Sequence, residues 1–582
     1  MLQQLVHMIA LSIVCIVWGI PVLLIWKTTI DRDDFWYRSF ASLLSFLFFC
    51  GCIILGLLSS WVNLIGTLHF LYLAIPTLLL IGYLIFFKSD NLKQIFGHLL
   101  KQNVLFNWVN GLFVFVSILV FLLLSSLQPV NGDTQLYHLQ VIRWQHEYGS
   151  VPGIVNLYPR LGLNSNWLNL ISWFYLPSLK SENFTYLNAA FVTWFFIWLF
   201  STWYFHLKQM RVRRSSRVLS CFYFLFLVYG LFDWQLFRDS ANSTNFDFPV
   251  NAFLFIIFSY FIESAVIGNT RSNFSMPLLF FCFALVGFKF SGVFIFILMA
   301  YYLFSLHSLS KWVTTALIGL LFLIPIVVRN YITTGYPFFP GTLSISAPDW
   351  QFPRALAQRF YTYILLSNKF YNHRLSFAFS HHTTTLDWIP YWWQGILLKH
   401  KIVLVLALSS LAFFFTKPSI VADYARLKYL VIILMLMIAG WFFTAPDPGR
   451  FGYGILLTGA FLFLSVFASA LFHPRVYQGL LIITTFTMCY YLFEKSRGLH
   501  FSDYWNAPAS NQNPGYSIIK SGEIDFHLPN KVNNNSDYRC YFTPLPCVTQ
   551  DNPYLEPRGK TIIKGFRMKP IPDSSFILNY NY

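Results

Sequence analysis

Asp133 opens a stretch of polar residues that could carry acid–base chemistry. Tyr137 and His138 follow it by about one helical turn, and Arg160 lies further along the same segment. A carboxylate among such groups can accept the proton of a substrate hydroxyl, and arginine forks bind anions. Because residues 134–148 contain no helix breaker, we expect a helix that starts just after Asp133. Asp133 could therefore simply be its N-cap, but the neighbouring histidine, tyrosines and arginines favour a general base.

A second polar segment, residues 238–249, carries more polar side chains than a tight turn requires. Asp247 in this segment is predicted to contact substrate. Two simpler interpretations remain for it, an interaction with the dipole of the helix expected at 248–267 or a place in a solvated loop. In the first segment, Asn156 and Asn164 are further candidates for binding substrate.

Three cations, Lys289, Arg329 and Arg450, stand at the ends of apolar stretches. Lysine and arginine in such places often extend to lipid headgroups. Their predicted side of the membrane is, however, the one where cations are disfavoured. We therefore predict that these three side chains bind an anion, for which a phosphate is the natural choice.

The composition explains why these polar clusters stand out. The chain has 582 residues, of which 56% are hydrophobic and 20% aromatic, and only 11% are charged, against roughly 25% in soluble domains. Apolar runs of about twenty residues recur along it, which is typical of a polytopic helical membrane protein. Soluble enzymes and disulfide-rich secreted chains are excluded. A nucleic-acid-binding role is also excluded, because the net charge of +17 is scattered between apolar spans.

The fold expected is all-α, with about fourteen transmembrane helices. Twelve apolar stretches are expected to form single spans: 4–26, 38–58, 64–87, 104–127, 183–205, 216–232, 248–267, 311–329, 402–416, 429–445, 451–471 and 476–493. The stretch 277–305 could be one long span or two short ones that meet at Lys289.

The distribution of basic residues favours two crossings there. The strongest basic cluster between two spans is Lys208, Arg211, Arg213, Arg214 and Arg217, which predicts a cytoplasmic loop. With two crossings in 277–305, most other basic loops also fall inside. Lys289 then lies near the outer surface, and segments 128–182, 330–400 and 494–582 all lie outside.

Residues 494–582 are predicted to form a small external cap of turns and short strands. They contain Cys540 and Cys547, which an oxidising compartment would allow to pair; two free thiols are the alternative. The predicted organisation is residues 1–103 as additional N-terminal helices, 104–493 as a membrane core with the two outer loops, and 494–582 as the cap.

Taken together, these motifs resemble the GT-C superfamily of membrane glycosyltransferases, in particular a poorly characterised bacterial inner-membrane group. The similarity covers about 104–582. It is carried by Gly132-Asp133 with Tyr137-His138, Asp247-Phe248-Pro249, Lys289 before Ser291-Gly292, Arg329-Asn330 with Gly335-Tyr336-Pro337, Pro446-Asp447-Pro448 with Arg450-Phe451, and the segment around Cys540 and Cys547. The three helices before residue 104 depart from the usual GT-C start and look like an added module.

The resemblance implies transfer of a sugar from a polyprenyl-phosphate donor to a glycan or lipid-linked acceptor at the periplasmic or extracellular face. Asp133 would take the acceptor proton in an inverting displacement. Arg450, Arg329 and Lys289 would stabilise the departing phosphate. The residues expected to bind the sugars are Tyr137, His138, Asn156, Arg160, Asn164 and Asp247. No metal ligands are identified, and the need for a divalent ion stays open.

Two other functions compete with this interpretation. A polysaccharide polymerase or ligase would use a lipid-diphosphate donor and rely on arginine and histidine instead of Asp133. A glycolipid transporter or flippase would place charged or helix-breaking sites near the bilayer midplane, and no such pattern is evident. A GT-C scaffold without activity is a further alternative.

Overall fold

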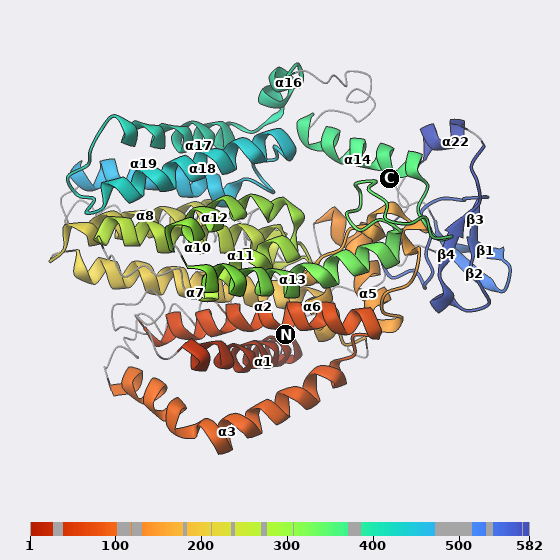
Figure 1. Ribbon diagram of the computed structural model, residues 1–582, viewed down its shortest axis with the longest axis horizontal. Helices are drawn as coiled ribbons and strands as arrows, with labels where there is room; N and C mark the ends of the chain where they lie inside the picture. Colours follow the sequence, from red (N-terminus) through yellow and green to blue (C-terminus); the bar gives the residue numbers. More distant parts are fainter. Residues whose placement is uncertain are drawn as a thin grey trace.

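The computed structural model is a bundle of helices with a small β-rich cap at one end (Figure 1). It describes residues 2–26, 39–101, 118, 131–177, 183–210, 212–233, 239–268, 276–306, 308–370, 386–471, 490, 515–530, 539–572 and 574–580. The expected spans 104–127 and 476–493 lie almost entirely outside these residues.

The long helices of the bundle lie side by side. They are α1 (Leu2–Trp26), α2 (Phe40–Ile65), α3 (Phe70–Lys101), α7 (Tyr186–Gln209), α8 (Arg214–Phe232), α10 (Asp247–Ile267), α11 (Met276–Phe288), α12 (Ile295–Leu306), α13 (Leu309–Thr334), α17 (Leu398–Ser409), α18 (Tyr424–Thr444) and α19 (Tyr453–Leu471). Within the described ranges, seven helices are long and apolar enough to cross a membrane, and a bent pair of helices at 388–414 adds an eighth candidate. The chain is thus a helical membrane protein, and the total of fourteen spans stays a prediction.

The first helices belong to the same bundle as the rest. α1 packs along α2, and α2 in turn contacts α6 (Asn166–Phe174), α7, α11 and α13. α2 also extends to Ile65, past its expected end at 58, and α3 starts later than expected, at Phe70. This packing places α2 in the interior, where Leu43, Phe46 and Phe49 are fully buried.

The stretch 277–305 forms two helices, with the break at Lys289. α11 ends at Phe288, the 3-10 helix η6 (Phe290–Phe294) follows, and α12 continues from Ile295. Lys289 has an extended backbone (φ −157°, ψ 129°). Lys289 therefore lies at the junction of α11 and α12 and not within a continuous helix.

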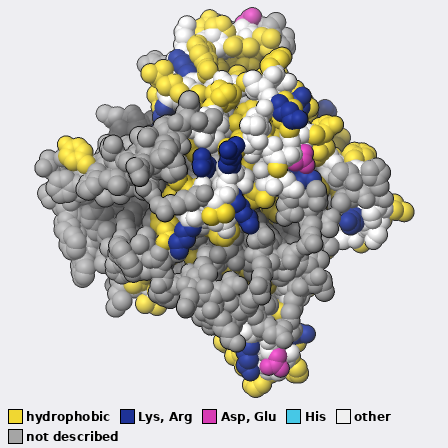
Figure 2. Space-filling view, turned by 90° about the vertical axis from the view of Figure 1, so that its left-hand side faces the viewer, with side chains coloured by type: hydrophobic (Ala, Val, Ile, Leu, Met, Phe, Trp, Pro, Cys, Tyr) yellow, Lys and Arg dark blue, Asp and Glu magenta, His cyan; other side chains and the backbone are white. Residues whose placement is uncertain are grey.

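The basic turn between α7 and α8 and the start of α10 lie at opposite ends of the bundle. α10 begins at Asp247, and near its other end Glu263 accepts a hydrogen bond from Tyr223 of α8 and lies 3.1 Å from His206 of α7. The basic turn that joins α7 to α8 is therefore at the end of the bundle opposite Asp247. Figure 2 views the end away from the cap, where lysine and arginine side chains are scattered among apolar ones.

Short helices gather at the Asp247 end. They are the π-helix η2 (Thr134–His138), α5 (Leu139–Glu147), the 3-10 helices η3 (Ile154–Asn156), η4 (Pro159–Gly162) and η5 (Asn183–Thr185), α14 (Arg354–Lys369) and α16 (Trp388–Gly395). The helix expected at 134–148 is confirmed, as η2 continued by α5. The 3-10 helix η7 (Ser410–Phe414) extends α17 at its far end.

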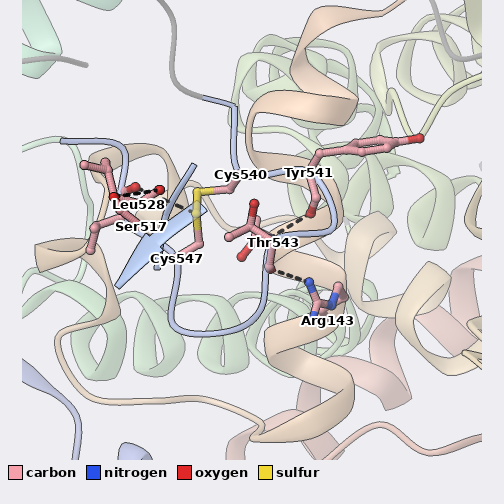
Figure 3. Close-up of a disulfide and its surroundings, with 9 residues drawn as sticks. Arg143, Ser517, Leu528, Cys540, Tyr541, Thr543 and Cys547 are labelled. Carbon is pink, nitrogen blue, oxygen red and sulfur yellow. Dashed lines mark hydrogen bonds between the residues drawn. A yellow bond between two sulfur atoms is a disulfide. The ribbon is translucent and has the colours of Figure 1, made fainter. Parts of the chain in front are cut away.

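The cap contains two antiparallel hairpins, as expected of turns and short strands. β1 (Tyr516–Ser521) pairs with β2 (Ile524–Pro529), and β3 (Leu555–Pro557) pairs with β4 (Phe566–Met568). The 3-10 helix η8 (Ile562–Lys564) and helix α22 (Ser574–Asn579) complete it. Cys540 and Cys547 form a disulfide (Figure 3), so the pairing predicted for them is confirmed.

The contact between α1 and α2 allows a test of this packing. A Cβ placed on Gly51 would lie 1.7 Å from the carbonyl oxygen of Cys15, whereas a Cβ on Gly82 in α3 meets nothing within 4 Å. We expect Gly51→Ala to destabilise the protein by about 2 kcal/mol or more, because backbone must move to admit the methyl group. Thermal unfolding in detergent measures this. Gly82→Ala is the matched control, and an equal loss in both variants would contradict the packing of α1 on α2.

Candidate functional site

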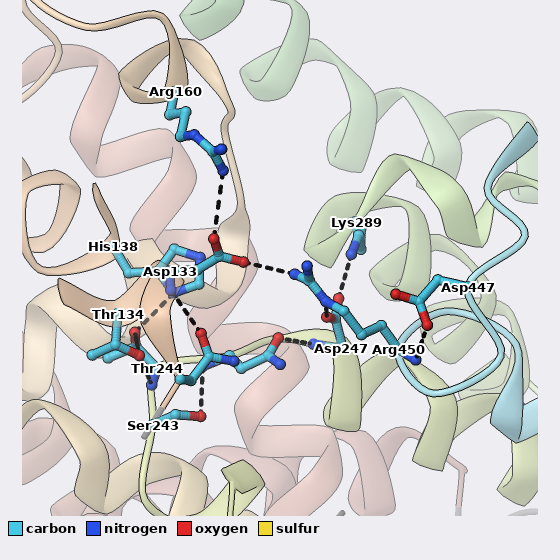
Figure 4. A network of polar contacts seen from close by, with 12 residues as sticks. Asp133, Thr134, His138, Arg160, Ser243, Thr244, Asp247, Lys289, Asp447 and Arg450 are labelled. Carbon is cyan, nitrogen blue, oxygen red and sulfur yellow. Dashed lines mark hydrogen bonds and ion pairs between the residues drawn. The ribbon is translucent and has the colours of Figure 1, made fainter. Parts of the chain in front are cut away.

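Asp133 stands at the start of the helix formed by η2 and α5, but its side chain does not cap that helix. The residue has helical angles (φ −63°, ψ −30°) and makes no side-chain capping hydrogen bond. Its carboxylate instead accepts a hydrogen bond from Arg450 Nη2 at 2.7 Å and lies 3.5 Å from Arg160 Nη1 (Figure 4). The N-cap interpretation is therefore wrong, and the carboxylate faces two cations.

Asp247 lies in the first turn of α10 and is just as closely paired. One carboxylate oxygen forms an ion pair with Lys289 Nζ, and the other accepts a hydrogen bond from Arg450 Nε at 3.1 Å. Only 4% of its side chain is exposed. The interpretation of Asp247 as part of a solvated loop is therefore wrong, and Arg450 bridges the two carboxylates.

The main chain around Arg450 is held by a third acid. The Asp447 carboxylate accepts hydrogen bonds from the backbone N–H groups of Gly449 and Arg450 at 3.0 and 3.1 Å. Asn251 of α10 donates a hydrogen bond to the Arg450 carbonyl at 2.9 Å. The loop between α18 and α19 thus presents the guanidinium in a fixed place. Asp447 was named in the sequence only as part of the family resemblance and was given no role in the site, although a Pro-Asp-Pro-Gly segment favours a tight turn.

Lys289 reaches the same place from the break between α11 and η6. Its ammonium lies 3.4 Å from the centre of the Phe451 ring and 5.4 Å from that of Phe246. Such cation–π contacts hold a lysine head without neutralising it. Lys289 and Arg450 therefore form a pair of cations around Asp247.

Arg160 approaches Asp133 from the other side and is surrounded by tyrosines. Its guanidinium lies 5.8 Å from the ring centre of Tyr137 and 5.5 Å from that of Tyr363, and it donates a hydrogen bond to the Tyr363 hydroxyl at 2.8 Å. Tyr363 comes from α14, within segment 330–400. It was missed in the sequence because nothing in that loop marks it among many aromatic residues.

His138 joins the two polar segments. Its Nδ1 lies 2.9 Å from Thr244 Oγ1, and Thr244 donates a hydrogen bond to Thr134 Oγ1 at 3.2 Å. Burial lowers the pKa of His138 to about 4, although the Asp133 carboxylate acts in the opposite direction. His138 is consequently a neutral imidazole at pH 7.

The charges around Asp133 keep it ionised. Burial alone would raise its pKa, but the positive charges of Arg450 and Arg160 contribute to lowering it to about 2. The carboxylates of Asp247 and Asp133 raise the pKa of Arg450, whose side chain is 44% exposed. The site therefore contains two carboxylates, Asp133 and Asp247, that contact three cations, an arrangement suited to binding an anion in exchange for one of the internal pairs.

Three of the predicted site residues lie outside this cluster. Arg329 is buried in α13 and bonds to the neutral Asn169 side chain, and it makes no ion pair within the described part of the chain. Asn164 bonds to Asn330 and Thr333 of α13.

Asn156 is fully buried and donates hydrogen bonds to the carbonyls of Gly153, Trp350 and Phe566. Its amide thus links segment 128–182, segment 330–400 and the cap. In this structure, Asn156 connects segments of the protein, and its NH₂ group is already occupied.

An apolar hollow lies beside the cations. It is small and partly open, and it is lined mainly by Leu254, Phe294, Met437, Trp441, Phe451 and Ile455, which come from α10, η6, α18, α19 and the loop before α19. Phe451 belongs both to this lining and to the Lys289 contact. No group of three metal-ligating side chains is found among the described residues.

The fold and this cluster define a class: a helical membrane protein with a buried acid–cation centre at one end of its bundle. The chain belongs to the family described as domain of unknown function DUF8201, whose model matches residues 1–457. The match includes the first three helices and ends within α19. No curated protein and no solved structure matches the chain.

The low pKa of His138 predicts a pH dependence of stability. A histidine whose pKa is depressed from 6.5 to about 4 in the folded protein contributes stability that is present above pH 6.5 and is lost as the pH falls toward 4. We expect the wild type to lose on the order of 2 kcal/mol more than His138→Gln over this interval. Thermal unfolding at several pH values measures the difference. Parallel curves for the two proteins would contradict the assignment of a buried, neutral imidazole.

Proposed function

We propose that this protein transfers a sugar from a polyprenyl-phosphate donor to a hydroxyl of a glycan or lipid-linked acceptor. The observation that carries the proposal is the position of the Asp133 carboxylate between Arg450 and Arg160, with Lys289 and Asp247 next to Arg450. The reaction would take place at the end of the bundle that carries the cap. We place that end on the outer side of a bacterial inner membrane, because the basic turn between α7 and α8 is at the opposite end.

The donor phosphate would bind at Lys289 and Arg450. Both cations are held by Asp247, and a phosphate can replace part of these pairs with charge-assisted hydrogen bonds of its own. The apolar side chains around the small hollow beside Phe451 give a donor lipid an apolar surface next to these cations. We assign no donor contact to Arg329, because its described partners lie in a different cluster.

Asp133 would act as the base once the donor is bound. With its pKa near 2, Asp133 is a weak proton acceptor while Arg450 is bonded to it. A phosphate that takes over Arg450 removes much of this stabilisation of the carboxylate, so its pKa rises toward that of an effective base. Substrate binding would thus activate Asp133, and the resting ion pair would keep it inactive.

The chemistry is a single displacement. The acceptor oxygen attacks the anomeric carbon while its proton passes to Asp133, and the bond from that carbon to the phosphate oxygen breaks with inversion. Lys289 and Arg450 stabilise the charge that grows on the departing phosphate. Base assistance of this kind contributes roughly 10²–10⁴-fold in rate. Arg160, Tyr137 and His138 lie on the other side of Asp133, where they would orient the acceptor.

A second candidate is a polymerase or ligase that uses a lipid-diphosphate donor. The low pKa of Asp133 favours it, because such an enzyme relies on its cations and needs no carboxylate base. A transporter or flippase is disfavoured, since the charged cluster gathers at one end of the bundle instead of the midplane.

The first test is transfer from a panel of polyprenyl-phosphate and polyprenyl-diphosphate sugars by the purified protein. We expect Asp133→Asn to abolish transfer from the monophosphate donor, because the amide keeps the shape but cannot take the proton. Asp349→Asn is the control, since Asp349 pairs with Arg558 in an exposed part of the outer region. Size-exclusion profiles verify folding. Transfer that survives in a folded Asp133→Asn protein would remove Asp133 as the base.

The cations give a separate prediction. Lys289→Met and Arg450→Gln are each expected to raise the donor KM on the order of tenfold or more, because each removes a charged contact to phosphate. Arg329→Gln is expected to leave the donor KM within about twofold. Steady-state kinetics with a short-chain polyprenyl-phosphate donor distinguish these outcomes. A large KM effect at Arg329 would restore it to the donor site.

A further inference from the structure

The loop closed by the disulfide lies against the helix that carries Asp133. Arg143 of α5 donates a hydrogen bond to the Thr543 carbonyl at 2.8 Å (Figure 3), and Gln140 donates one to the Tyr541 carbonyl at 2.8 Å. Gln140 is buried, with 2% exposed. Two side chains of the helix are therefore bound to the main chain of a segment some four hundred residues away.

The same loop also contacts the π-helix. In η2, the N–H of Leu139 bonds to the carbonyl of Thr134, so this turn is wider than an α-helical one. The Tyr541 N–H donates a hydrogen bond to the Gln135 carbonyl within this turn at 3.1 Å. Arg539, just before the disulfide, donates to the Gln135 side chain at 2.9 Å. The wide turn is thus held from outside at the residue two positions after Asp133.

The loop itself is fixed on both sides. Tyr541 has a φ of +34°, which is uncommon for an aromatic residue and persists only where the surroundings impose it. Its neighbour Cys540 is bonded to Cys547. Beyond that, the N–H of Val548 donates to the His527 carbonyl at 3.0 Å, and the N–H of His527 to the Pro546 carbonyl at 3.0 Å. The disulfide therefore connects a constrained turn to strand β2.

We propose that the disulfide-closed loop Cys540–Cys547 is a positioning element for Asp133, which acts by holding the π-helix and α5 in place. This inference rests on the proposed function for its kinetic consequence, whereas its structural consequence is independent of any activity. The hydrogen bonds described above join the loop to the helix, and none of them ends on the carboxylate or on a cation of the site. Its effect passes through Gln135, Gln140 and Arg143.

We expect the loss of this loop to slow the chemical step without weakening donor binding. Lys289 and Arg450 come from the break after α11 and from the loop before α19, and none of the hydrogen bonds described above joins the disulfide loop to either segment. If the helix formed by η2 and α5 is held less firmly, Asp133 is misplaced by a fraction of an ångström or more. Such a displacement is enough to slow the chemical step. The kcat should therefore fall while the KM for the donor stays nearly unchanged.

The experiment combines hydrogen exchange with kinetics in the full-length protein. In Cys540→Ser/Cys547→Ser we expect amide exchange in residues 134–147 to accelerate about tenfold, and kcat to fall roughly 10–100-fold with the donor KM within about twofold. Gln140→Leu/Arg143→Leu, which leaves the disulfide intact, should shift both quantities in the same direction. Glu556→Gln is the control, because it removes ion pairs to Arg567 and Lys569 within the β3–β4 hairpin and should change neither.

Each outcome decides the question. Unchanged exchange in residues 134–147 in both double variants would overturn the proposal, and so would a loss of activity that appears in KM instead of kcat. If the wild type shows no transfer with any donor, the proposed function fails, but faster exchange confined to residues 134–147 would still establish the mechanical coupling. The Gln140→Leu/Arg143→Leu protein keeps the test valid should the cysteine variant fail to fold.

Discussion

The site depends on a single guanidinium that two carboxylates share. Arg450 contacts Asp133 on one side and Asp247 on the other. It therefore joins the start of the η2–α5 helix to the start of α10. The Asp247 side chain is only 4% exposed, so its charge would be costly in isolation, and removal of its cations would leave it uncompensated. The arrangement is stable only as a set, which explains why Asp447 and Asn251 fix the main chain that carries Arg450.

Much of this arrangement could be predicted from the sequence. In an apolar chain, polar residues at the ends of spans stand out, and the positive-inside rule places Asp133, Asp247, Lys289 and Arg450 at one face. The break at Lys289 and the disulfide of the cap follow from similar reasoning. These signals are strong because a bilayer gives charged and polar side chains few tolerable places.

Other features depend on contacts that leave no local signal. Arg329 occurs at the end of a span, as Lys289 and Arg450 do, but the rotation of α13 turns it toward Asn169. Tyr363 is one aromatic residue among many, and only the packing of α14 brings it to Arg160. The π-helix differs from an α-helix by one residue in its hydrogen bonding, and no composition or spacing marks such a turn.

The cap is bonded to a helix that lies far from it in the sequence, and this has a consequence for the assembly of the protein. The helix formed by η2 and α5 leaves the ribosome early. The segment from Arg539 to Thr543, which is hydrogen-bonded to this helix, is made some four hundred residues later. Contacts of such long range form late. A nascent chain would therefore hold its membrane helices in place before the helix that carries Asp133 is fixed from outside. The geometry around Asp133 would thus be complete only after residues 539–547 have been made and the disulfide has formed.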